Sequence, residues 1–165
     1  MQIKRFFKHM LTMPWLVRRY FSAAAMHDIQ SAISESEHTH SGEIRFVVEA
    51  ALHPLQLIHG ITPHQRAIEL FAQLGIWDTE HNNGVLVYLS LADRRVEVVG
   101  DRGIHGHVGT AGWESICKEM ESAFRQSRFE AGVLQGIARI TEVLQQHFPA
   151  NGANQNELPD EPLIL

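Results

Sequence analysis

The amino-acid sequence predicts an α/β fold in which helices sandwich a small mixed β-sheet. Two observations lead to this prediction. Short segments with the alternating or continuous apolar character of strands lie between longer segments that repeat apolar residues with the helical period. The 165 residues, 44% of them hydrophobic, also suit a single folded core. We expect a basic aromatic N-terminal arm at 1–21, one domain at 22–148 and a flexible tail at 149–165.

The first predicted elements of the domain are a helix and a strand. Ser22 can cap a helix that runs to about Glu37, with its apolar residues on one face. A polar stretch ends this pattern, and residues 43–50 then alternate between the two faces of an extended chain. This alternation predicts the first strand.

The next helix has a clear start signal. Thr62 can cap it, Pro63 suits its first turn, and Gln65 three residues after the cap completes a capping box. The side chains that we expect to face the core are Ile68, Phe71 and Leu74.

Two strands follow this helix. Residues 84–91 are continuously apolar, as in a central strand that is covered on both faces, and residues 95–100 alternate. The short link between them predicts an antiparallel hairpin. The strand–helix–strand unit before the hairpin predicts a parallel, right-handed connection.

The remaining sequence predicts a glycine-rich loop and then two helices, at 112–125 and 129–147. The second helix should bury Val133, Ile137, Ile140 and Leu144. From Pro149 onward the chain is rich in Asn, Pro and acidic residues, and we expect it to be flexible.

The charge is unevenly distributed. The net charge is −5, yet residues 1–27 contain five cations and no acid. The acidic remainder argues against nucleic-acid binding. Arg18 and Arg19 follow the short apolar run where a signal peptide would need small residues, and no segment reaches the about 18 apolar residues of a transmembrane helix. With a single cysteine, these features predict a cytoplasmic protein, peripheral to the inner membrane.

The N-terminal arm has two interpretations. Its cations and aromatic residues suit contact with an anionic membrane surface or docking to a protein partner. Alternatively, the aromatic side chains cover the domain's own core. The residues assigned to membrane or partner binding are Lys4, Arg5, Lys8, Trp15, Arg18 and Arg19.

A second candidate site follows from the predicted topology. The amino-terminal ends of the two parallel strands share an edge of the sheet with the carboxyl end of the third strand. Side chains at this edge could hold a divalent cation through Glu43, Asn83, Asp101 and His105, with Asn82 and Arg102 as further ligand-binding residues. Oxygen ligands favour calcium or magnesium, whereas histidine shifts the preference toward zinc or manganese. The same residues could instead form only turns and a local ion pair.

Several motifs in this order resemble the TPM domain family, which has thylakoid, photosystem-repair and nematode channel-associated members. The matching stretches cover 82–89, 93–97, 100–104 and 123–132. The resemblance implies an α/β sandwich and an accessory role in assembling, repairing or modulating membrane complexes. Many members have Asp-Asn-Gly where this chain has Asn82-Asn83-Gly84, which removes one acidic ligand.

Two functions therefore compete. The first is a non-enzymatic accessory or assembly factor that binds a protein partner or a membrane surface, with a divalent cation at the sheet edge. The second, which the resemblance also implies, is a metal-dependent phosphatase. In that enzyme the cation would polarise a phosphoryl oxygen, Asp101 would serve as ligand or base, and Arg102 would hold the phosphate.

Overall fold

The sheet is mixed and has four strands, in the order β3-β2-β1-β4. In the computed structural model, which describes residues 3–150, 152 and 155–165, β1 (Glu43–Glu49) pairs in parallel with β2 (Gly84–Ser90). Strand β3 (Arg95–Gly100) pairs antiparallel with β2, and β4 (Leu163–Ile164) pairs in parallel with β1. The predicted α/β class, the parallel unit and the hairpin are confirmed.

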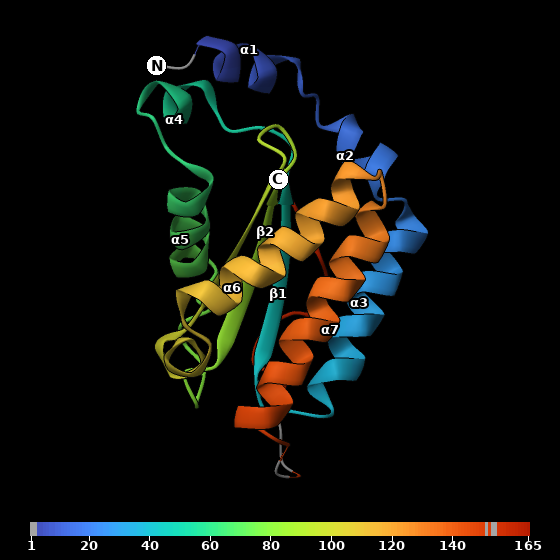
Figure 1. Cartoon of the computed structure of the whole chain (residues 1–165), viewed down its shortest axis with the longest axis vertical. Helices are drawn as coiled ribbons and strands as arrows, with labels where there is room; N and C mark the ends of the chain where they lie inside the picture. Colours follow the sequence, from blue (N-terminus) through green and yellow to red (C-terminus); the bar gives the residue numbers. More distant parts are fainter. Residues whose placement is uncertain (1–2, 151, 153–154) are drawn as a thin grey trace.

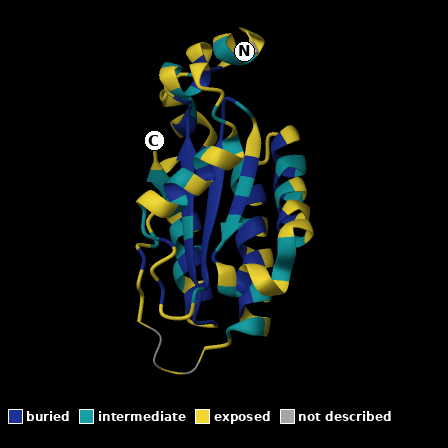
Figure 2. Ribbon diagram, turned by 90° about the vertical axis from the view of Figure 1, so that its left-hand side faces the viewer, coloured by how far each residue is buried: buried dark blue, intermediate teal, exposed yellow. Residues whose placement is uncertain are grey.

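Helices cover both faces of this sheet (Figure 1). The described residues form α1 (Ile3–Leu11), α2 (Trp15–Tyr20), α3 (Ala23–Glu37), α4 (Pro54–Ile58), α5 (Pro63–Gln73), α6 (Arg102–Arg125) and α7 (Phe129–His147). The larger core lies between one face and α3, α6 and α7, and it contains the α7 side chains predicted to point inward. The smaller core lies between the other face and α5, and the two central strands, β1 and β2, are almost entirely buried between these layers (Figure 2).

Capping explains where two of the predicted helices begin. The Ser22 side chain accepts a hydrogen bond from the Ala25 amide, and Thr62 and Gln65 form the expected capping box. The predicted inward stripe of α5 is partly wrong, because Ile68 is 49% exposed and the buried residues are Ala67 and Leu70. The helix is therefore rotated relative to the prediction, which places Ile68 at its solvent-exposed side.

The glycine-rich segment is helical, so the predicted loop is wrong. Helix α6 begins at Arg102, with Asp101 as its cap, and the Asp101 carbonyl accepts a hydrogen bond from the His105 amide at 2.8 Å. Gly109, at φ 68° and ψ 171°, is not helical, and it divides α6 into two helical segments that meet at a kink. Two positions here require glycine: a side chain at Gly109 would strain a left-handed backbone, and a β-carbon at Gly103 would lie 2.5 Å from the Asn82 carbonyl oxygen. Capping and packing onto β3 outweigh the low helix propensity of this segment.

The tail was predicted to be flexible, and residues 155–165 contradict this. The Leu158 amide donates to Glu43 at 3.2 Å, and main-chain hydrogen bonds link Leu165 to Val48 and Ala50. Arg45 also donates to two tail carbonyls, those of Pro159 and Glu161. These partners lie far away in the sequence, so composition alone could not reveal that the tail supplies a strand. Residues 151, 153 and 154 of the predicted tail lie outside the described residues.

Part of the N-terminal arm joins the core. Val17 and Phe21 are buried, and the rings of Phe21 and Phe46 lie 6.0 Å apart. Tyr20 packs on Phe129 at a ring distance of 4.2 Å, which fixes α2 beside the junction of α6 and α7. The interpretation that the arm covers the domain's own core thus holds for the end of the arm, and α1 requires separate consideration.

Candidate functional site

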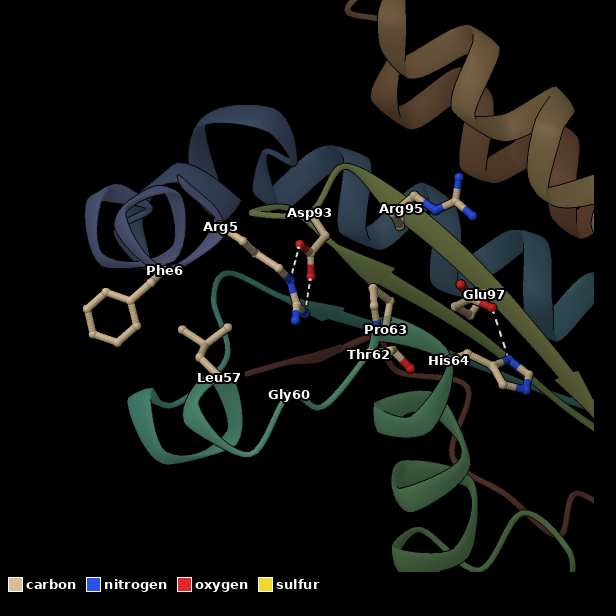
Figure 3. A pocket seen from close by; sticks show the side chains of 10 residues that line it. All are labelled: Arg5, Phe6, Leu57, Gly60, Thr62, Pro63, His64, Asp93, Arg95 and Glu97. Atoms are coloured by element: carbon tan, nitrogen blue, oxygen red, sulfur yellow. Dashed lines mark hydrogen bonds and ion pairs between the residues drawn. The ribbon is translucent and has the colours of Figure 1, made fainter. Parts of the chain in front are cut away.

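Helix α1 docks onto the domain through its polar side. Arg5 forms a bidentate ion pair with Asp93 in the turn between β2 and β3, with both Nε–Oδ1 and Nη2–Oδ2 distances at 2.8 Å (Figure 3). Its Nη1 atom donates to the Ile61 carbonyl, also at 2.8 Å. Because the guanidinium is fully engaged within the chain, Arg5 holds the arm in place and is not part of a free cationic surface.

His9 completes this contact from the next turn of α1. Its ring is buried, and Nδ1 accepts a hydrogen bond from the Leu52 amide at 3.0 Å. Its Nε2 atom lies 3.1 Å from Asp93 Oδ1. Burial alone would raise the pKa of Asp93, but the hydrogen bonds from Arg5 and His9 outweigh burial and hold that pKa well below its usual range. The carboxylate therefore remains charged and anchors α1.

The opposite side of α1 is apolar and faces solvent. An amphipathic helix normally buries its apolar face, so this orientation is inverted. We define the outer apolar face as the exposed residues Ile3, Phe7, Met10, Leu11, Met13 and Trp15, which are between 51% and 77% exposed. The region around the N-terminus is accordingly marked as exposed in Figure 2.

This outer apolar face continues onto α4 and is flanked by positive charge. Helix α4 contacts α1 and adds Leu55 and Ile58, each 59% exposed. Four cations on α1 and α2 are also exposed, namely Lys4, Lys8, Arg18 and Arg19. Of the residues predicted to bind a membrane or partner, all except Arg5 are therefore exposed on one arm.

A cleft of about 550 Å³ separates α1 from the body of the domain (Figure 3). It is lined by Arg5, Phe6, Leu57, Gly60, Thr62, Pro63, His64, Asp93, Arg95 and Glu97. His64 pairs with Glu97 at 3.1 Å, and the hydroxyl of Thr62, the only one among the lining residues, accepts the capping bond of α5. The side chains of His64 and Thr62 are therefore both engaged within the chain.

The residues predicted at the amino-terminal edge of the sheet gather around Gly84. Glu43 is the register partner of Gly84, Asn83 precedes it, and the Asp101 amide donates to its carbonyl at 2.8 Å. All three side chains are buried. The segments that the predicted topology places at one edge of the sheet therefore do lie together.

Each of these three side chains leaves one oxygen without a partner. Glu43 Oε2 accepts from Leu158, Asn83 Nδ2 donates to Ser41, and Asp101 Oδ1 accepts from the Arg102 amide at 2.6 Å. The remaining oxygens have no hydrogen bond with any described residue, and they are Glu43 Oε1, Asn83 Oδ1 and Asp101 Oδ2. Burial raises the pKa of Glu43, as expected for a carboxyl in such surroundings.

The other predicted edge residues have different partners. His105 is exposed and its Nδ1 accepts from Trp113 Nε1 at 3.2 Å, while Arg102 Nε donates to Asn82 Oδ1 at 3.2 Å. Among the described residues, no three His, Cys, Asp or Glu side chains are placed to hold a metal ion. Glu43, Asp101 and His105 are therefore not assembled as a three-ligand site, and the edge offers oxygen atoms rather than imidazole.

Glu37 at this edge was missed by the sequence interpretation. Its Oε1 accepts from the Ile44 amide at 3.0 Å, and the side chain is buried. Burial, together with the negative charges of Glu43 and Asp160, raises the pKa of Glu37 to about 9. The only sequence signal was an acid at the end of an amphipathic helix, which normally lies in solvent.

Comparisons with known proteins agree with this fold. A family model described as the TPM domain matches residues 18–143. The solved structure of the BA42 protein from the psychrophilic bacterium Bizionia argentinensis is 28% identical, with a TM-score of 0.77, and the match covers 88% of this chain and 95% of that one. The N-terminal domain of a P. gingivalis protein shares the fold at 20% identity, with a TM-score of 0.63 and 78% coverage of both chains. No functionally curated protein matches.

Proposed function

Because the chain belongs to the TPM domain family, we propose that it is a non-enzymatic accessory domain that attaches to an anionic membrane surface through the outer apolar face. The inverted orientation of α1 carries this proposal. The Arg5–Asp93 pair directs the polar side of the helix inward, so Ile3 and Phe7 are held outward. None of the helices in the described residues is long and apolar enough to cross a membrane, so attachment would occur at the interface.

The energetics suit peripheral binding. Full burial of a large apolar side chain contributes about 1.5–3 kcal/mol, and a cation near an anionic surface adds about 1 kcal/mol. The apolar residues are in contact with solvent on one arm, and the four exposed cations flank them. This charge complementarity favours an anionic lipid surface over an apolar protein groove, which would leave the cations unpaired.

Vesicle flotation tests this proposal. The double variant Ile3→Gln/Phe7→Gln should bind vesicles of phosphatidylcholine and phosphatidylglycerol at least about tenfold more weakly, because each side chain loses its apolar transfer energy. The matched control is Ile68→Gln/Trp77→Gln, which removes two apolar side chains of similar exposure (49% and 55%, against 62% and 60% for Ile3 and Phe7) from another surface. That control should float like the unchanged chain. Added salt should weaken vesicle binding of the unchanged chain and of the control, because it screens the attraction between the cations and the anionic lipid.

Two results would contradict the membrane proposal. Equal flotation of the Ile3→Gln/Phe7→Gln variant and the control would show that the outer apolar face is not the contact. Failure of the unchanged chain to bind any vesicle would indicate instead that a protein covers this face.

A second candidate function is divalent cation binding at the amino-terminal edge, favoured by the three buried oxygens around Gly84. Carboxylate and amide oxygens are the donors that calcium and magnesium prefer, and Glu43, Asn83 and Asp101 would hold the ion, with water completing its shell. A bound cation would polarise a phosphoryl oxygen, and this supports the alternative of a metal-dependent phosphatase. Arg102 lies at the same edge and is bonded to Asn82.

A thermal-shift titration of the chelator-treated protein tests this cation site. Calcium or magnesium should raise the melting temperature in a saturable way, corresponding to about 2.7 kcal/mol at 100 times the dissociation constant. Asp101→Asn should abolish the shift while preserving the helix cap, since asparagine also caps well. Asp78→Asn, at an exposed aspartate, should leave the shift intact. An equal shift in both variants, or none with any of calcium, magnesium, manganese and zinc, would rule out this site.

A further inference from the structure

A second cavity lies between the arm and the body of the domain, distinct from the cleft in Figure 3. Its volume is about 410 Å³, within the range of about 300–1,000 Å³ that is typical of small-molecule sites. It is bounded by α1, α2, the end of β2 and the junction where α6 meets α7, which lies beside α2 in Figure 1. Its walls are largely apolar and include Leu16, Tyr20, Leu89, Leu91, Phe124 and Phe129.

Cations from three different elements line the same cavity. Lys8 comes from α1, Arg94 from the β2–β3 turn and Arg125 from the end of α6. All three are exposed, and none of their side chains forms a hydrogen bond or ion pair with the residues that the structure describes. The one acidic lining residue, Glu121, accepts from the Val96 amide and lies 3.5 Å from Arg95. The cavity therefore combines apolar walls with uncompensated positive charge.

The backbone around the cavity carries a second observation. Arg94 and Ser127, which both line it, have φ values of 54° and 60°. Among the described residues, the only other non-glycine position with positive φ is Asn82, a residue type that adopts this conformation more readily. Strained backbone of this kind clusters at ligand clamps. Here the two positions lie in the two loops that line the cavity, the β2–β3 turn and the α6–α7 junction.

We propose that this cavity binds one acyl chain of an anionic lipid, with the carboxylate or phosphate held by Lys8, Arg94 and Arg125. The apolar walls suit the chain, and cations from three elements suit a head group with several acceptor oxygens. This lipid site rests on the proposed function, because the membrane that the outer apolar face contacts would supply the lipid. A lipid held there would tie the arm, the hairpin turn and the α6–α7 junction together.

Binding of dodecanoate to the full chain, without vesicles, tests the cavity. Displacement of a fluorescent fatty acid should be saturable and should fit one site. The double variant Lys8→Gln/Arg125→Gln should weaken dodecanoate binding about tenfold or more. Arg128→Gln is the matched control, because Arg128 is exposed on the same junction but does not line the cavity, and it should bind normally. Dodecanol, which has the chain without the anion, should compete poorly.

The outcomes separate this inference from the membrane proposal. No saturable binding of dodecanoate to the unchanged chain would overturn the lipid site, whatever vesicle flotation shows. Equal affinities for dodecanoate and dodecanol, or an unchanged affinity in Lys8→Gln/Arg125→Gln, would overturn the role of the cations. Saturable, cation-dependent binding supports the site even if the vesicle assay fails, because the fatty acid assay contains no membrane.

Discussion

Replacing Glu37 with glutamine is expected to stabilise the protein at neutral and alkaline pH. The buried carboxyl has a pKa of about 9, so it is protonated in the folded chain at pH 7, whereas it ionises near pH 4.3 in the unfolded chain. Ionisation therefore favours the unfolded state over this whole interval. Glutamine keeps an oxygen that can accept from the Ile44 amide but cannot ionise.

The pH dependence gives the size of this effect. A raised folded-state pKa means that the contribution of Glu37 to stability is complete below about pH 4.3 and is lost as the pH rises toward 9. At about 1.4 kcal/mol per pH unit, the loss between about pH 4.3 and pH 7 reaches about 4 kcal/mol. Glu37→Gln should recover up to that amount, so its advantage over the unchanged chain should grow from pH 5 to pH 8.

Urea denaturation at several pH values measures this advantage. Glu35→Gln is the control, because Glu35 lies two residues earlier on the same helix and is exposed. Its free energy of unfolding should follow that of the unchanged chain at every pH. If Glu37→Gln were destabilising at pH 8, the carboxyl would have to be ionised and favourably bound in the folded protein.

The second large effect is expected at Gly84, where β2 begins. A β-carbon at this position would lie 2.1 Å from the Ile76 carbonyl oxygen, which is a backbone atom and cannot rotate away. Gly84→Ala should therefore displace either the strand or the segment after α5, and it should lower the free energy of unfolding by about 3 kcal/mol. This displacement would also disturb the three buried oxygens around Gly84.

A matched substitution separates this clash from a general effect of losing glycine. Gly106 lies within α6, and a β-carbon there would meet no heavy atom within 4 Å. Gly106→Ala should raise the free energy of unfolding by about 0.5–1 kcal/mol through helix propensity. Thermal denaturation of the two variants should thus show melting temperatures that move in opposite directions. A Gly84→Ala protein as stable as the unchanged chain would contradict the close approach.

The sequence predicted the elements whose signals are local. The apolar run at 84–91 indicated β2 because burial on both faces requires apolar residues throughout. The alternation at 43–50 indicated β1 because successive side chains of a strand point to opposite faces. The capping box at Thr62 fixed the start of α5 for a similar reason. Where a few neighbouring residues supply the hydrogen-bond partners of the backbone, the sequence alone predicts the element.

The features that were missed depend on partners far away in the chain. The early start of α6 relies on packing against β3, and β4 relies on Arg45 and Glu43 to hold the tail. The edge residues around Gly84 were predicted because strand direction alone brings them together. The orientation of α1 could not be predicted, since it depends on Asp93 in a distant turn drawing Arg5 inward. The unpartnered oxygens likewise become visible only once every neighbour is placed.

The fourth strand has a consequence for folding kinetics. The β2–β3 hairpin closes a short loop, an event that takes about 1–10 μs in isolated hairpins. In contrast, the tail must return across 115 sequence positions before Leu158 meets Glu43 and β4 reaches β1. Closing such a long loop costs conformational entropy, and the contacts that offset this cost form late in folding. Until then the backbone hydrogen-bonding groups at the outer edge of β1 are unpaired and can pair with another chain. Refolding at high protein concentration should therefore give a lower yield of folded protein, because aggregation begins at that strand.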